Sequence, residues 1–233
     1  MESTKRGLKR RLNMHYKIKL DKEIIIKSEN AAKSVLQQNK KLLKYLECIP
    51  KEAKVLDYGC GKLRYSLFFL HRGNKVCAVD SSVQISRKQK INTDSNVSII
   101  DIKKSFEDLE VYLIDEFKMQ KEFEWAICTN VLSAIPFEQV RFDVLKNIKK
   151  SLKIGGKLIL SLQYRNSYFK SYEKRENAVK YGDGWILENN NNYTFYGIIP
   201  PEKIKHMCET LDFKILEEKI IDGSIILKLE NSL

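Results

Sequence analysis

The chain has 233 residues, enough to bury one good-sized hydrophobic core, and its formal net charge is +12. Its apolar runs are far too short to cross a lipid bilayer, and the basic N-terminus lacks the apolar stretch of a secretory signal, so we expect a cytoplasmic protein without a membrane segment. The five cysteines are odd in number and never occur in C-x-x-C spacing, which argues against zinc or any other metal and against a disulfide framework.

The first fifty residues are interpreted as a basic N-terminal arm and one packing helix, and residues 51–233 as the main domain. Seven Lys or Arg residues and one Glu within the first nineteen positions give +6, half of the total charge. Such an arm is an electrostatic footprint for phosphate-rich partners, and it is equally what a Lys-rich composition yields without any binding role. Residues 29–46 then predict an amphipathic helix with leucines at near-helical spacing, which Pro50 closes.

A short apolar strand that runs directly into a glycine turn is the most informative feature of the main domain. Its sequence over residues 55–62 is Val-Leu-Asp-Tyr-Gly-Cys-Gly-Lys. A chain that leaves a buried strand and turns at once into a helix needs positive φ or close backbone approach, which glycine allows at least steric cost. The next strand, residues 75–79, leads into Asp80, where a carboxylate can accept hydrogen bonds from both hydroxyls of a ribose. The pattern therefore indicates a site for a nucleoside cofactor.

This segment resembles motif I of class I S-adenosylmethionine (SAM) methyltransferases, an apolar strand followed by D-x-G-x-G-x-G. Asp57, Gly59 and Gly61 are in step with the motif, and Leu63 stands where the third glycine usually falls. A dinucleotide-binding domain uses a similar arrangement, but its G-x-G-x-x-G fingerprint would place a glycine at Arg64, where a long charged side chain hinders close packing over a pyrophosphate. A nicotinamide cofactor is therefore the runner-up.

Strand and helix patterns alternate along the rest of the domain. Short Val- and Ile-rich runs, typical of strands buried on both faces of a parallel sheet, are separated by helical stretches that stop at glycines. After the fifth strand come a helix and two strands joined by Asp222-Gly223, which is a hairpin signal. The expected strands are residues 55–57, 75–79, 97–100, 125–128, 157–162, 213–221 and 224–229, and the expected helices are residues 63–72, 138–152 and 202–211.

An antiparallel hairpin that closes an otherwise parallel sheet is the pattern known for class I methyltransferases. The resemblance therefore implies an α/β fold, a Rossmann-like three-layer sandwich with a seven-stranded, mostly parallel sheet, over residues 55–229, about three quarters of the chain. Two further segments carry it: residues 123–132 resemble the fourth-strand motif of the family, and residues 152–159 resemble its L-K-P-G-G turn. Glu124 and Ile154 replace the Asp and the Pro of the family.

The resemblance also implies which residues bind SAM. Asp57 and the backbone amides of the glycine turn would hold the methionine end, Asp80 the ribose, and Asp101, after the expected third strand, the adenine. Thr129 and Asn130, just past the fourth strand, would line the floor under the sulfonium. The complete set of implied cofactor-binding residues is Asp57, Gly59, Cys60, Gly61, Asp80, Ser81, Asp101, Ile102, Thr129 and Asn130.

Three cations and one histidine are further candidates for this site. Lys62 and Arg64 are near the turn, and Lys27 belongs to the N-terminal segment, so each could meet the carboxylate of SAM or remain a solvated charge. A general base is optional in methyl transfer from a sulfonium, because aligning the acceptor and excluding water provide most of the acceleration. The catalytic residue is therefore left unassigned, with His15 of the arm as a candidate to reach the site.

Residues 164–200 interrupt the fold between the fifth strand and the last helix, and they are rich in aromatic side chains. Long insertions are usually functional or disordered, and aromatic residues argue against disorder. The insertion is therefore interpreted as a lid or acceptor pocket, with packing onto the sheet edge as the alternative. The substrate-contact candidates are Tyr164, Trp185, Tyr193 and Tyr196.

The function expected from these features is methyl transfer from SAM to an oxygen or nitrogen of a small molecule. The chain has Thr-Asn-Val-Leu at residues 129–132, where base-amino methyltransferases resemble one another in an N/D-P-P-Y/F turn, and it has no Pro-Cys nucleophile of the cytosine-C5 type. An RNA methyltransferase, acting on tRNA through the basic arm, is the first alternative. A partner subunit that keeps the fold without catalysis is the second, and Leu63 and Glu124 are the residues that favour it.

Overall fold

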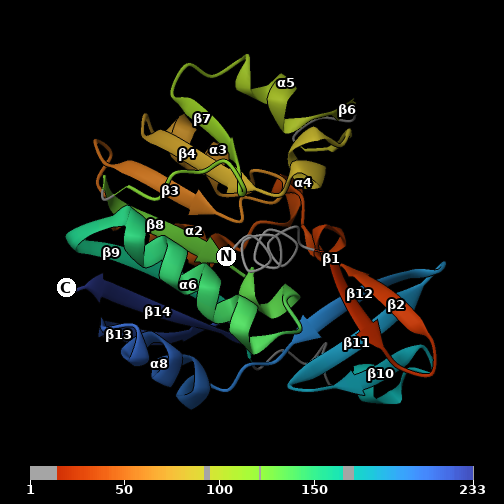
Figure 1. Ribbon diagram of the computed structural model, residues 1–233. Coiled ribbons are helices and arrows are strands. Elements are labelled where there is room, and N and C mark those ends of the chain that lie inside the picture. The colour runs from red at the N-terminus through yellow and green to blue at the C-terminus, as the bar shows by residue number, and fades with distance from the viewer. Residues whose placement is uncertain (1–14, 92–94, 121, 165–170, 233) are drawn as a thin grey trace, which may run out of the picture.

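The computed structural model describes residues 15–91, 95–120, 122–164 and 171–232, and its larger sheet has seven strands (Figure 1). Five adjacent strands are parallel to one another, and an antiparallel hairpin of the last two strands of the chain completes the sheet at one edge. The spatial order is β13 (Phe213–Ile221), β14 (Ser224–Asn231), β9 (Leu152–Gln163), β8 (Phe123–Thr129), β3 (Lys54–Tyr58), β4 (Lys75–Asp80) and β7 (Leu109–Leu113).

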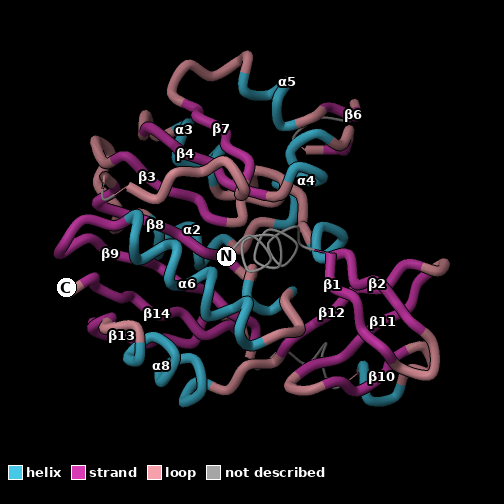
Figure 2. Tube along the Cα trace, in the orientation of Figure 1, coloured by secondary structure: helices cyan, strands magenta, loops and turns pink. Residues whose placement is uncertain are grey.

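Helices cover both faces of this sheet (Figures 1 and 2). The longer ones are α2 (Lys40–Leu46), α3 (Ser66–His71), α6 (Glu138–Ser151) and α8 (Pro201–Thr210), and α4 (Ser82–Ser86) and α5 (Ile99–Lys103) are short. Val55 and Leu56 are neighbours on β3 and both are fully buried, but they belong to core clusters on opposite faces. One cluster contains side chains of α6 and α8, and the other contains side chains of α2 and α3. The three-layer α/β sandwich with its closing hairpin is therefore confirmed.

The predicted third strand, residues 97–100, is wrong. Residues Asn96–Val97 form β6, which pairs only with β5 (Gln89–Lys90), and the chain then enters α5. The cause is a local cap: the Ser98 hydroxyl accepts a hydrogen bond from the Asp101 amide (3.1 Å), and the Asp101 carboxylate accepts one from the Ser98 amide (3.2 Å). The third parallel strand is instead β7, which begins at Leu109, and the sequence did not predict a strand there.

The predicted helix over residues 29–46 is also wrong in extent. The segment folds as two short helical turns, η1 (Ser28–Ala31) and η2 (Val35–Gln37), followed by α2. Each restart has its own cap: Ser34 and Gln37 exchange hydrogen bonds across η2, and the Asn39 side chain accepts one from the Leu42 amide (3.0 Å).

The N-terminal segment and the aromatic insertion together form a second, five-stranded sheet (Figure 1). Its order is β1 (His15–Lys19), β2 (Glu23–Lys27), β12 (Asn192–Gly197), β11 (Gly184–Asn189) and β10 (Ala178–Tyr181). The two parts join where Tyr193 pairs with Ile26. The proposed boundary at residue 50 therefore separates segments that share one sheet.

A buried ion pair fixes this second sheet to α6. The Arg141 side chain is 1% exposed, donates through Nε to the Ile135 carbonyl (2.7 Å), and forms a two-pronged pair with Asp183 between β10 and β11, with Nη2 at 2.8 Å from Oδ1. Burial opposes ionisation of Asp183, but the hydrogen bonds and charge of Arg141 lower its pKa overall.

Within the described ranges, no helix has the length and apolar character to cross a membrane.

Candidate functional site

The glycine turn after β3 is held by the next strand. The amides of Gly59 and Cys60 both donate to the Val79 carbonyl, at 2.8 and 3.2 Å. Gly59 has φ of +82°, and a Cβ added there would lie 2.3 Å from a methyl group of Val131. Both the backbone conformation and the space therefore require glycine at this position.

Leu63 keeps the backbone conformation that the missing third glycine would have provided. Its φ is +56°, and its side chain is fully buried in the core cluster beneath α3. The departure from the motif therefore leaves the turn intact, because the leucine adopts the left-handed conformation and fills the core at the same time.

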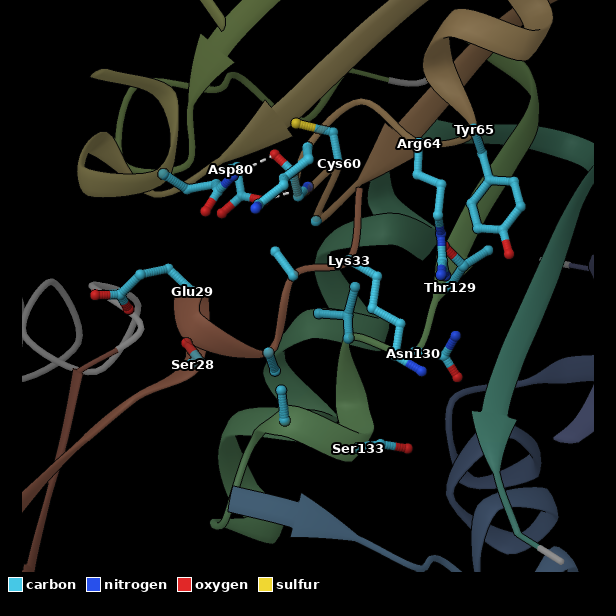
Figure 3. A pocket seen from close by; sticks show the side chains of 18 of the residues that line it. Ser28, Glu29, Lys33, Cys60, Arg64, Tyr65, Asp80, Thr129, Asn130 and Ser133 are labelled. Carbon is cyan, nitrogen blue, oxygen red and sulfur yellow. Dashed lines mark hydrogen bonds between the residues drawn. The ribbon is translucent and has the colours of Figure 1, made fainter. Parts of the chain in front are cut away.

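Asp80 lies at the end of β4 with its carboxylate facing the turn (Figure 3). Its Oδ2 accepts from the Gly61 amide (2.8 Å) and its Oδ1 from the Ser81 amide (2.7 Å). Burial raises the pKa of this carboxyl to about 6, although the two amide hydrogen bonds act in the opposite direction. Each carboxylate oxygen retains acceptor capacity for a ligand donor.

Asp57 lies beneath the turn and not in the pocket lining. Its Oδ2 accepts from the Ser66 hydroxyl (2.6 Å), and its Oδ1 has no hydrogen-bond partner among the described residues. Burial, with a smaller contribution from the charge of Asp80, raises its pKa to about 7. The structure thus gives Asp57 contacts that support the turn.

A pocket of about 870 Å³, its open mouth included, lies where the turn, β4 and β8 end (Figure 3). Of the predicted cofactor residues, Gly59, Cys60, Gly61, Asp80, Thr129 and Asn130 line it. Ser81 does not, since its hydroxyl caps α4 by accepting from the Gln84 amide (3.3 Å). Cys60 is buried, which raises the pKa of its thiol well above the usual value, so it fills space in the turn.

Asp101 and Ile102 must be corrected as adenine contacts. They lie in α5, not after the third strand, and neither lines the pocket. Hydrogen bonds from Ser98 and Lys104 occupy the Asp101 carboxylate and hold its pKa well below the usual range. The true third strand ends at Leu113, and the amide of the next residue, Ile114, donates to the Asp80 carbonyl (2.8 Å).

The four aromatic candidates have different environments. Tyr196 lines the pocket, whereas Trp185 packs under Lys180 (4.9 Å from Nζ to the ring centre) and Tyr193 under Lys22 (5.5 Å). Tyr164 packs against the hydrophobic core. The insertion therefore contributes to the pocket wall through Tyr196 and its neighbour Phe195, which the sequence did not single out.

Several of the residues missed by sequence analysis come from a cover segment, which we define as residues 28–33. Glu29 and Lys33 of this segment line the pocket, as do Ser133 and Gln163. Glu29 and Lys33 were missed because residues 29–46 were assigned to a packing helix, and no sequence signal identified Ser133 or Gln163. Lys27, which was a candidate, instead donates to Asn192 (3.2 Å) at the junction of the second sheet.

Three cations line the pocket, and in the part of the chain that the structure describes none of them has a carboxylate within salt-bridge distance: Lys33, Lys62 and Arg64. Burial and the nearby charge of Arg64 lower the pKa of Lys33, while burial and Arg87 lower that of Lys62. Figure 3 shows Lys33 and Arg64 near Asn130, with Asp80 and Glu29 at the opposite end. The pocket thus carries negative charge at one end and positive charge at the other.

Known proteins share both the sequence pattern and the fold. Residues 29–218 match the model of a methyltransferase domain family. The uncharacterized protein YmfD of Escherichia coli (strain K12) is 31% identical over 200 residues, which are 85% of this chain and 89% of YmfD.

Two solved structures are similar in fold. The PH0226 protein of Pyrococcus horikoshii OT3 aligns with a TM-score of 0.63 at 20% identity, over 82% of this chain and 85% of that one. The Burkholderia thailandensis 1,6-didemethyltoxoflavin-N1-methyltransferase, solved with 1,6-didemethyltoxoflavin and S-adenosylhomocysteine, aligns with a TM-score of 0.56 at 16% identity, over 84% and 77%. The chain belongs to the methyltransferase domain family, which confirms the SAM-dependent methyltransferase predicted from its glycine turn.

Proposed function

We propose that the pocket binds SAM with its ribose at Asp80 and its methionine end toward Lys33 and Arg64, and that the enzyme methylates a nitrogen or oxygen of a small molecule. The observation that carries this proposal is the hydrogen bond between the glycine turn and the buried Asp80 carboxylate, together with pocket cations that have no carboxylate partner among the described residues. A zwitterionic amino acid joined to a nucleoside matches this distribution of charge, because its carboxylate needs cations and its ribose hydroxyls need acceptors.

Thr129 and Asn130 lie beside Lys33 and Arg64 at the cationic end of the pocket (Figure 3). Asn130 has φ of +60°, and its amide donates to the Ser161 carbonyl (2.7 Å), which fixes the turn after β8. Its side-chain oxygen is buried and has no hydrogen-bond partner among the described residues. A ligand ammonium group would satisfy this oxygen, so we place the methionine amino group there.

When bound, SAM would supply a methyl group attached to a positively charged sulfur, and the remainder of the cofactor is a neutral thioether and therefore a good leaving group. The chain's own contribution is alignment and exclusion of water. Tyr196 and Phe195 close the pocket from the second sheet, and Ser133 and Gln163 place polar groups on the same wall. We assign the acceptor to this wall, since it is lined by both aromatic and hydrogen-bonding side chains.

A small-molecule acceptor is favoured because the pocket wall carries aromatic and hydrogen-bonding side chains together, those of Tyr196, Phe195, Ser133 and Gln163. The structurally similar Burkholderia thailandensis protein is named as the N1-methyltransferase of 1,6-didemethyltoxoflavin. RNA stays as the competing acceptor because of the net charge of +12. Methylation with isotope-labelled SAM, offered a small-molecule extract or tRNA in parallel, distinguishes them: incorporation into tRNA alone would overturn the small-molecule assignment.

The cofactor assignment is tested by isothermal titration calorimetry with S-adenosylhomocysteine. Asp80→Asn should weaken binding about ten- to a hundredfold, because a charged hydrogen bond contributes roughly 1.5 to 3 kcal/mol. Asp101→Asn is the matched control, since its carboxylate lies outside the pocket and should leave the affinity unchanged. Absence of binding by the unmodified chain, or equal affinity of D80N, would contradict the proposal.

A further inference from the structure

Glu29 has a buried carboxylate that the described residues satisfy only in part. Its side chain is 5% exposed, and Oε1 lies 2.8 Å from His15 Nε2, which donates to it when that nitrogen carries the proton. The other oxygen, Oε2, is buried and has no hydrogen-bond partner among the described residues. Burying an unsatisfied carboxylate oxygen is costly, so a ligand donor at this position would explain it.

The backbone around Glu29 is fixed independently of its side chain. Arg87 donates through Nη2 to the Glu29 carbonyl (2.7 Å) and through Nη1 to the Asn30 side chain (3.4 Å). Further along the cover segment, the Ala32 methyl lies 3.4 Å from the position a Cβ would take at Gly61. The segment therefore rests on the glycine turn, and this fixed backbone keeps Glu29 in the lining of the pocket.

Glu29 belongs to the nucleoside end of the pocket. Both Glu29 and Asp80 line it, and Figure 3 shows them at the same end, away from Lys33, Arg64 and Asn130. A cofactor whose ribose is held by Asp80 and whose carboxylate points to Lys33 would bring its nucleoside, not its amino acid, to Glu29.

We propose that Glu29 is a second nucleoside-binding carboxylate, supplied by the N-terminal part of the chain, and that its free oxygen accepts a hydrogen bond from the adenosine part of SAM. The inference rests on the proposed function, because it takes the orientation of the cofactor from Asp80. The donor is a ribose hydroxyl or the exocyclic amino group of adenine, since these are the donors that adenosine offers.

The test compares two ligands in calorimetry on the full chain: S-adenosylhomocysteine, and methylthioadenosine, which keeps the nucleoside and sulfur but lacks the amino acid. Glu29→Gln should weaken both by about tenfold, because a neutral amide oxygen replaces a charged acceptor. Lys33→Met, in the same segment, is the matched control and should weaken only S-adenosylhomocysteine. Unfolding midpoints without ligand establish that each variant is folded. If E29Q is unstable, Glu29→Asp replaces it: this variant withdraws the carboxylate by one methylene and should lose the same affinity for both ligands.

The outcomes separate the two proposals. If the unmodified chain binds both ligands and E29Q binds them equally well, or loses only S-adenosylhomocysteine, the role of Glu29 is overturned while the proposed function stands. If the unmodified chain binds neither ligand, both fall. The deaminated analogue methylthioinosine identifies the donor: a preference for the amino purine that disappears in E29Q assigns the exocyclic amine, and an equal loss for both analogues assigns the ribose.

Discussion

At the scale of single residues, Leu63 shows how a family motif can change without losing its geometry. A non-glycine residue in the left-handed region costs roughly 1 to 2 kcal/mol. Full burial of a leucine contributes about 1.5 to 3 kcal/mol relative to exposure, which is enough to offset that cost. Leu63 therefore indicates an intact turn, and the loss of the third glycine does not by itself argue for a non-catalytic partner subunit.

Substitution of Leu63 tests this balance. Leu63→Ala should destabilise the protein by about 2 to 5 kcal/mol, since it removes a buried side chain and keeps the strain. Leu63→Gly removes slightly more but relieves the positive φ, so it should be at least as stable as L63A in chemical denaturation. Leu67, buried in α3, is the control. There the order of stability should reverse, and L67A should be more stable than L67G, because glycine is unfavourable inside a helix. The same order at both positions would contradict the interpretation.

The position of the third strand removes the acid that was expected at the adenine. Asp101 lies in α5, and Asp115, the second residue after β7, is exposed; neither lines the pocket. Asp101→Asn and Asp115→Asn should therefore both leave the affinity for S-adenosylhomocysteine unchanged in calorimetry, unlike Asp80→Asn. A loss of about tenfold in either variant, as expected for removal of a charged hydrogen bond, would show that its carboxylate does reach the cofactor.

At the scale of elements, sequence patterns predicted the strands whose burial shows in consecutive residues. The strands β3, β4 and β8 are mostly apolar, and the site residues stand at or just after their ends: the glycine turn after β3, Asp80 at the end of β4, and Asn130 after β8. The edge strand β7 was missed because its Leu-Glu-Val-Tyr-Leu sequence includes exposed and half-buried positions. The cover segment could not be predicted either, since its place over the turn depends on tertiary contacts such as that of Arg87.

The ion pair between α6 and the second sheet is the element contact with the largest expected effect. Asp183→Ala should destabilise the protein by about 3 to 5 kcal/mol, because it leaves the Arg141 guanidinium buried without a counter-charge. Lys203→Met is the control: Lys203 also approaches Asp183 (3.4 Å) but is partly exposed, and its loss should cost about 1 kcal/mol or less. Equal effects in urea denaturation would show that Arg141 does not depend on Asp183.

At the scale of the whole molecule, the site is assembled from parts distant in sequence. The second sheet joins residues 15–27 to residues 178–197, and it brings Tyr196 to the same pocket as the cover segment. The glycine turn and Asp80 come from the larger sheet. Residues on both sides of the predicted boundary at residue 50 pair in the second sheet, and both sheets contribute side chains to one core cluster.

Two buried carboxylates in this assembly affect the stability of the ligand-free protein. Burial raises the pKa of Asp57 to about 7 and that of Asp80 to about 6, from 3.8. Between about pH 4 and pH 7 the folded state therefore binds more protons than the unfolded state, and the stabilisation present at low pH is lost as pH rises through the folded pKa values. Asp183 and Asp222 have lowered pKa values and act in the opposite sense, but in the window below about pH 4.

Chemical denaturation at several pH values checks this expectation. The free energy of unfolding of the unmodified chain should fall from about pH 4 to pH 7, by at most about 1.4 kcal/mol per pH unit for each group. Asp57→Asn resembles the protonated acid, cannot ionise, and keeps an oxygen that can accept from Ser66. The free energy of unfolding of D57N should equal that of the unmodified chain near pH 4 and be larger near pH 8, because it should fall less steeply between these pH values. An unchanged slope in D57N would mean that Asp57 ionises in the folded protein as easily as in the unfolded chain, and the burial argument for this carboxyl would then be wrong.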